Sequence, residues 1–146
     1  MNSKFKCSAV LILMLAPLFQ ITADAHTLQG AIPASKTAVV RWRITCYEPA
    51  AQMIFRLRQV ATKNFSVNLT ITSLGGIPGQ VATTTTMPIK NIWTPYSSIQ
   101  GGAGDYLLEL SKVGKNPNQA ITYTVEDHCD TASGEHTQQS DAVRVR

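Results

Sequence analysis

Apolar and polar residues alternate through most of the chain. The clearest stretch is residues 64–72, where every second side chain is apolar: Phe65, Val67, Leu69 and Ile71. Such alternation is typical of a β-strand with one face in the core and one in solvent. It predicts further strands, which in chain order cover residues 37–46, 53–58, 80–87, 106–111, 121–129 and 143–145. No segment shows a sustained helical period.

The longest continuous pattern spans residues 101–129 and predicts a β-hairpin. The apolar face of its first strand begins at Tyr106, and that of its second strand ends at Cys129. Gly114 and Pro117 interrupt the pattern between the two strands, and a glycine-rich run before the first permits positive φ angles. We therefore expect these two strands to pair with each other.

Three segments predict something other than a core strand. Residues 26–36 are polar and contain Gly and Pro, so we expect a lead-in without strand structure. The threonine run in 80–87 favours an edge strand, because it has β propensity but little core content. Residues 88–95 predict a loop in which Trp93 covers the core, while an exposed Trp93 with Tyr96 would instead stack on a sugar.

The number and spacing of these strands indicate one all-β domain. Seven or eight short strands separated by turns, without repeat or linker, predict a single antiparallel β-sandwich. Residues 26–146 are sufficient for such a domain to bury a core of its own.

The first 25 residues have the pattern of a secretory signal peptide. Two lysines precede an apolar run at 9–19, and Ala23, Asp24 and Ala25 give the small-x-small cleavage pattern. The run is too short for the alternative, an N-terminal membrane anchor, and no later segment has membrane-spanning length. We expect a secreted or periplasmic domain that begins at His26 and has no membrane span.

Charge argues against nucleic acid as a partner. The chain carries 13 Lys and Arg against 9 Asp and Glu, a mild excess without a basic cluster interleaved with aromatic residues. Arg41, Arg43, Arg56 and Arg58 would form one modest basic patch if their two strands pair as a hairpin. That patch would suit an acidic surface or a polysaccharide; the alternative is a solvated strand face.

Two cysteines, Cys46 and Cys129, remain after removal of the signal peptide. An even pair in an exported chain predicts a disulfide. Each cysteine continues the apolar face of its strand, so both sulfur atoms would point into the core. The alternative is a pair of thiolate metal ligands.

No catalytic motif is present, which predicts that the protein is not an enzyme. The sequence has no G-x-S-x-G, no H-E-x-x-H and no phosphate-binding loop. Asp127, Asp130 and Glu135 lack the D-x-D spacing of an ordered calcium loop, so we interpret them as solvated loop charges. A hydrolase or polysaccharide-active enzyme would need a cleft lined by Trp93, Tyr96 and the C-terminal carboxylates, which are Glu126, Asp127, Asp130, Glu135 and Asp141.

The chain has three histidines, and signal cleavage would place the first of them at the N-terminus. His26 would then present both a free α-amine and an imidazole, which resembles the histidine brace of copper-dependent polysaccharide monooxygenases and of periplasmic copper-carrier β-sandwiches. Either His128, on the outward face of its strand, or His136, in the following loop, would supply the second imidazole. Nitrogen ligands of this kind suit Cu(II). The His-Gly start common in the monooxygenases is missing.

A second resemblance involves the glycine-rich run at 101–104, the strand that begins at Tyr106 and the later Tyr123-Thr-Val segment. Together they resemble the closing hairpin of bacterial pre-peptidase C-terminal-type domains. The resemblance implies a small secreted jelly-roll-like sandwich that acts as an accessory or binding module. The acidic strand that this family often links to calcium has no counterpart, because residues 65–71 contain no Asp.

The sequence thus predicts two functions. The first is an exported, non-catalytic binding module without a cofactor, whose partner is a protein or polysaccharide at the cell surface or in the periplasm. The second is a copper-binding protein that uses His26 with His128 or His136.

Overall fold

The computed structural model describes residues 25–146, so the predicted signal peptide lies outside the described part except for Ala25. This part of the chain forms nine β-strands: β1 (His26–Ile32), β2 (Val40–Cys46), β3 (Gln52–Gln59), β4 (Phe65–Ser73), β5 (Val81–Thr85), β6 (Ser97–Ile99), β7 (Gly104–Gly114), β8 (Ile121–Asp130) and β9 (Val143–Val145). Among the described residues there is no helix that could cross a membrane.

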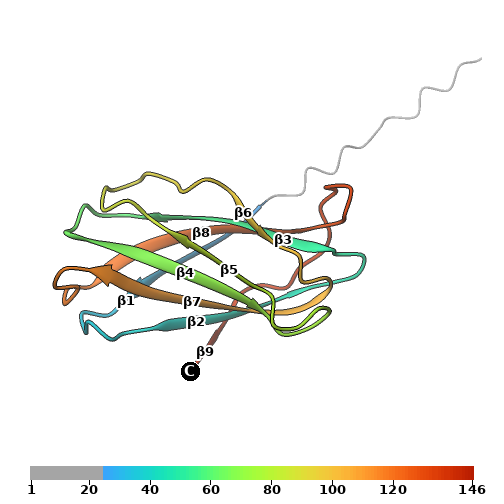
Figure 1. Ribbon diagram of the computed structural model, residues 1–146, viewed down its shortest axis with the longest axis horizontal. Coiled ribbons are helices and arrows are strands. Elements are labelled where there is room, and N and C mark those ends of the chain that lie inside the picture. The colour runs from blue at the N-terminus through green and yellow to red at the C-terminus, as the bar shows by residue number, and fades with distance from the viewer. Residues whose placement is uncertain (1–24) are drawn as a thin grey trace, which may run out of the picture.

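The strands form two antiparallel sheets that pack face to face (Figure 1). One sheet has the order β1-β8-β3-β6, and the other has the order β5-β4-β7-β2-β9. The inward positions of both sheets make the core, which includes the fully buried rings of Phe55, Tyr106 and Tyr123. The predicted all-β sandwich is therefore confirmed, and β5 is the edge strand that its threonines indicated.

The predicted hairpin at residues 101–129 is wrong. β7 pairs with β4 and β2, whereas β8 pairs with β1 and β3, so the two strands belong to opposite sheets. Residues 115–120 carry the chain across the roughly 10 Å that separates packed sheets. Both strands lie inside their sheets, where each pairs with two neighbours and has no free edge for the other.

The predicted lead-in at residues 26–36 contains a strand, β1, which pairs with β8 along its whole length. Only Leu28 and Ile32 on β1 are buried apolar residues, because the inward position between them is Gly30. The Tyr123 ring fills the space above Gly30, and a Cβ atom there would collide with the Tyr123 hydroxyl. Because the Tyr123 ring approaches so closely, position 30 holds glycine, and the alternating pattern of β1 lacks one apolar residue.

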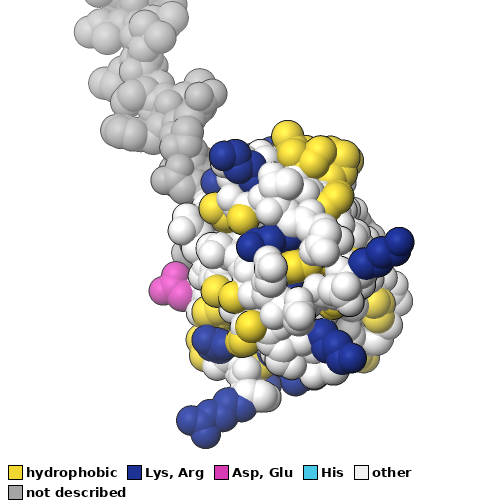
Figure 2. Space-filling model, turned by 90° about the vertical axis from the view of Figure 1, so that its left-hand side faces the viewer, with side chains coloured by type: hydrophobic (Ala, Val, Ile, Leu, Met, Phe, Trp, Pro, Cys, Tyr) yellow, Lys and Arg dark blue, Asp and Glu magenta, His cyan; other side chains and the backbone are white. Residues whose placement is uncertain are grey.

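The four strand arginines do not form one patch. Arg41 and Arg43 lie on β2, and Arg56 and Arg58 lie on β3, in the other sheet. Arg41 pairs with Glu109 across its own sheet, with 2.6 Å between Nε and Oε1. Figure 2 shows Lys and Arg side chains dispersed among uncharged ones over one end of the molecule.

The predicted disulfide joins the two sheets. Cys46, the last residue of β2, bonds to Cys129 of β8, and their Cα atoms are 5.7 Å apart. Both cysteines are buried in the core. The bond fixes the end of the sandwich at which β8 leads into residues 131–142.

Candidate metal centre

All three histidines of the chain line a single pocket. His26 comes from β1, His128 from β8 and His136 from the segment that follows β8. The pocket has a volume of about 460 Å³ and is completed by Tyr47 and residues 137–139. The first strand and a segment near the C-terminus thus meet at one end of the sandwich.

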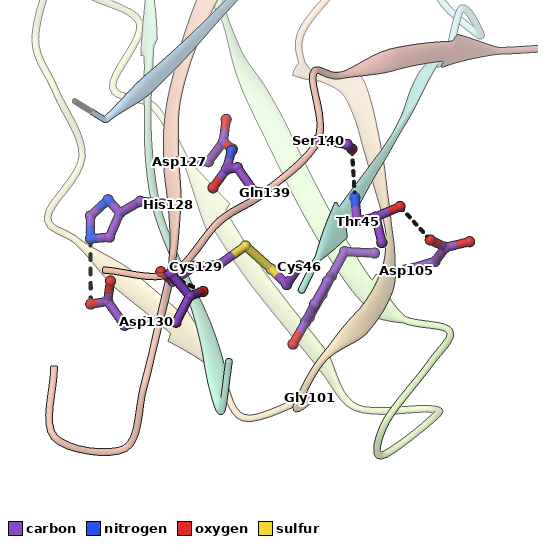
Figure 3. The surroundings of a disulfide bond; sticks show 12 residues. Thr45, Cys46, Gly101, Asp105, Asp127, His128, Cys129, Asp130, Gln139 and Ser140 are labelled. Atoms are coloured by element: carbon purple, nitrogen blue, oxygen red, sulfur yellow. Dashed lines mark hydrogen bonds and ion pairs between the residues drawn. A yellow bond between two sulfur atoms is a disulfide. The ribbon is translucent and has the colours of Figure 1, made fainter. Parts of the chain in front are cut away.

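β8 places two of the polar side chains on the same face of its sheet. His128 and Asp130 are two residues apart, and in a strand such residues point in the same direction. Nε2 of His128 lies 3.6 Å from Oδ2 of Asp130 (Figure 3). The side chains are 15 % and 5 % exposed, respectively, so both are held largely away from solvent.

A tight turn after β8 brings His136 back to the same place. The amide of Thr131 donates to the carbonyl of Glu135, and the amide of Thr137 donates to the carbonyl of Cys129, both at 2.8 Å. Residue 136 therefore lies beside β8, where its Nδ1 is 3.1 Å from Oδ1 of Asp130.

The two C-terminal histidines and Asp130 form a compact group. The ring centroids of His128 and His136 are 4.5 Å apart. One ligand atom from each of His128, Asp130 and His136 lies within 4.8 Å of the others. Within residues 25–146, this is the one group of three or more His, Cys, Asp or Glu side chains close enough to hold a metal ion.

Two buried polar atoms in this group lack hydrogen-bond partners. They are Nδ1 of His128 and Oδ1 of Asp130, since the short contact from His136 to Asp130 does not have hydrogen-bond geometry. Folded proteins leave few buried polar atoms unpaired, and a bound cation can satisfy a carboxylate oxygen that has no hydrogen-bond donor. The Asp130 carboxylate is therefore available to a cation held between the two imidazoles.

The electrostatics of the group favour the metal-binding form of His128. Burial lowers the pKa of its imidazole; the carboxylate of Asp130 opposes this shift, and His136 adds to it. An imidazole whose pKa is lowered is neutral at pH 7, and the neutral form is the one that coordinates metals.

His26 shares the pocket without belonging to the compact group. The first strand pairs His26 with Asp127, the residue before His128, and this register brings the start of β1 to the rim of the site. The sequence predicted His128 or His136 as the partner of His26; the structure places both of them at the same pocket. Sequence reasoning missed Asp130, which it interpreted as a loop charge.

Asp127 and Glu135 do not join the group. Asp127 points to the side of β8 opposite His128 (Figure 3) and is 1 % exposed, and burial raises its pKa to about 6. Glu135 is exposed in the turn. A calcium site made of Asp127, Asp130 and Glu135, which the sequence spacing did not support, is not assembled by the fold.

An arginine packs against both aromatic residues next to the site. The guanidinium of Arg56 lies 4.5 Å from the ring centroids of both Trp93 and Tyr96, and it pairs with Glu126 at 2.7 Å. Trp93 also stacks with Arg58 at 4.5 Å. Trp93 thus covers arginines on the outer face of β3, contrary to the prediction that it covers the core.

Neither the models of known protein families nor the curated proteins give a match to this chain. The resemblance to pre-peptidase C-terminal-type domains therefore stays a prediction. The geometry of the chain itself is what bears on its function.

Proposed function

We propose that the protein is an exported β-sandwich that binds a transition-metal ion, preferably copper, at His128, His136 and Asp130. His26 supplies additional nitrogen ligands from the rim. The observation that supports this function is the gathering of every histidine of the chain at one pocket, from three separate parts of the sequence.

The donor set favours a first-row transition metal over a hard cation. Two imidazoles and one carboxylate suit copper, zinc and nickel, whereas calcium and magnesium prefer six or more oxygen atoms. Copper(II) stands highest among the divalent ions in the general order of affinities. The free α-amine of His26, present if cleavage follows Ala25, would add the type of ligand that square-planar copper(II) accepts.

The buried group fits a bound ion. A cation beside Asp130 would provide the partner that Oδ1 of this carboxylate lacks and would compensate its buried charge. Cys129 lies between His128 and Asp130 in the sequence, and its disulfide restrains the backbone of both ligands in the metal-free protein. The chain therefore loses little conformational freedom on binding.

We propose binding rather than catalysis. Arg56 stacks on both Trp93 and Tyr96, which reduces the aromatic surface that a polysaccharide-active enzyme would offer beside the metal. In this role the protein would carry or sequester the metal outside the cytoplasm.

The first test is a calorimetric titration of the mature protein, beginning at His26, with Cu(II) and then Zn(II). We expect one tightly bound Cu(II) per chain, with Zn(II) weaker. His136→Ala should weaken Cu(II) binding by at least about tenfold, which corresponds to about 1.4 kcal/mol. Glu135→Gln, an exposed change in the same turn, is the matched control and should leave the affinity unchanged.

A form with one extra residue before His26 tests whether the α-amine of His26 binds the ion in addition to His128, Asp130 and His136. Weaker binding by this form would assign the α-amine as a ligand, and unchanged binding would restrict the site to His128, Asp130 and His136. Equal, weak Cu(II) binding by the wild type and by His136→Ala would overturn the proposed function.

A further inference from the structure

A second pocket lies on the other side of β8, between the start of β1 and the segment that leads into β9. It has a volume of about 320 Å³. Asp127 of β8 lines it together with Gln139 and Asp141 of that segment. Leu28, Ile44 and Ala142 contribute apolar walls. His26 is the one histidine that borders both this pocket and the metal centre.

The buried polar atoms of this pocket that lack partners are both hydrogen-bond acceptors. Gln139 donates from Nε2 to Oδ2 of Asp127 at 2.6 Å, which leaves Oδ1 of Asp127 and Oε1 of Gln139 without hydrogen bonds (Figure 3). The carboxylate fixes the orientation of the amide, because only the NH₂ group can donate to it. A ligand that satisfies the pocket must therefore bring donors.

The charge of the pocket specifies the ligand further. Asp127 is 1 % exposed, and Asp141 adds a second carboxylate at the same pocket. In the described part of the chain, the His26 imidazole forms no ion pair with Asp127, and no Lys or Arg does so. His26 stabilises the Asp127 carboxylate through space, but no cation among the described residues contacts it. A buried carboxylate without a contacting counter-charge is costly, so a cationic donor is the complementary ligand.

We propose that this pocket binds a small organic ammonium ion, whose N–H groups donate to Asp127 and Gln139. Its aliphatic part lies against Leu28, Ile44 and Ala142. A volume of about 320 Å³ falls in the range of sites for small organic ligands and far exceeds that of a bare metal ion. Calcium would also need more oxygen ligands than the three side chains offer. This site is separate from the proposed metal centre.

The experiment is an NMR chemical-shift titration of the metal-free mature protein with n-butylammonium chloride. We expect saturable shifts of residues around this pocket. Two probes control for its chemistry: 1-butanol has the same chain without the charge, and tetramethylammonium has the charge without an N–H donor. Neither should saturate at concentrations that saturate the n-butylammonium signal.

Substitutions test whether n-butylammonium binds in the pocket at Asp127. Asp127→Asn keeps the shape of the side chain and the bond from Gln139, and it should weaken n-butylammonium binding by at least about tenfold. Ala142→Leu, which reduces the pocket without touching the carboxylate, should also weaken binding and serves if Asp127→Asn does not fold. Glu48→Gln, an exposed carboxylate away from the pocket, should have no effect.

The outcome is independent of the metal proposal. His136→Ala should leave n-butylammonium binding unchanged, even though it removes a metal ligand. The ammonium site is disproved if n-butylammonium binds no better than 1-butanol, if Asp127→Asn and Ala142→Leu bind it as well as the wild type, or if His136→Ala abolishes its binding.

Discussion

Asp130 is the residue through which the two C-terminal histidines are brought together. It contacts His128 at 3.6 Å and His136 at 3.1 Å while its own side chain is 5 % exposed. The i, i+2 spacing of His128 and Asp130 was visible in the sequence, and it becomes informative once the strand is known to continue through Asp130. The approach of His136 depends on the turn geometry after β8, which alternation does not encode.

The core has no room for even one additional carbon atom at Gly30. Gly30→Ala would push a Cβ atom into the Tyr123 hydroxyl, which accepts a hydrogen bond from Nε1 of Trp42 at 2.8 Å. We expect this substitution to lower the free energy of unfolding by about 1–3 kcal/mol, as overpacking does. Chemical denaturation measures the change.

Gly30→Ala combined with Tyr123→Phe provides the control. Removal of the hydroxyl makes room for the new methyl group, so the double variant should lose less than the sum of the two single variants. Full additivity of the two losses would contradict the proposed collision.

At the scale of elements, the sequence predicts strands better than it predicts their partners. Seven of the nine strands overlap alternating segments, because half-buried strands need an apolar residue at every second position. β6 has one apolar residue, Ile99, and therefore shows no alternation, whereas Gly30 interrupts the alternation of β1. The alternation of apolar and polar residues in β7 and β8 does not indicate that the chain crosses from one sheet to the other between them.

Lys112 stabilises the connection at residues 115–120, where the chain crosses from β7 to β8. It continues the inward face of β7, is 6 % exposed, and its ammonium donates to the carbonyls of Pro33, Ala34 and Gln119. It therefore ties the β1–β2 connection to the β7–β8 crossing, two segments that no strand pairing joins.

Lys112→Met should lower the free energy of unfolding by about 2–3 kcal/mol, because three carbonyl groups lose their hydrogen bonds to a charged donor. Thermal and denaturant unfolding of the two forms measures the loss. Lys115→Met, an exposed lysine three residues further along, is the matched control. Equal stability of both variants would contradict the bridging role of Lys112.

At the scale of the whole molecule, the disulfide couples the stability of the sandwich to the candidate metal centre. It joins residues 83 positions apart and holds β8 between the two proposed ligands of that strand. The sequence predicted the bond, because both cysteines continue apolar faces. The closeness of the bond to the histidines depends on the sheet order, which the sequence did not provide.

Replacing Cys46 and Cys129 together by Ala should lower the free energy of unfolding by about 4–5 kcal/mol in the chain-entropy account. The looser end of β8 should also reduce Cu(II) affinity at temperatures where circular dichroism still shows a folded sandwich. Denaturant unfolding and copper titration measure the two effects. Unchanged affinity in a folded double variant would mean that the strand pairing alone positions His128 and Asp130.

The crossing and the disulfide together determine what a protease could do to this protein. Residues 115–120 are mostly exposed, and a cut there would divide the chain into one piece with β1 to β7 and another with β8 and β9. Cys46 lies in the first piece and Cys129 in the second. The cleaved molecule would therefore remain a covalent two-chain protein. It would run as one band on a non-reducing gel, and the two chains would separate only when a reductant is added.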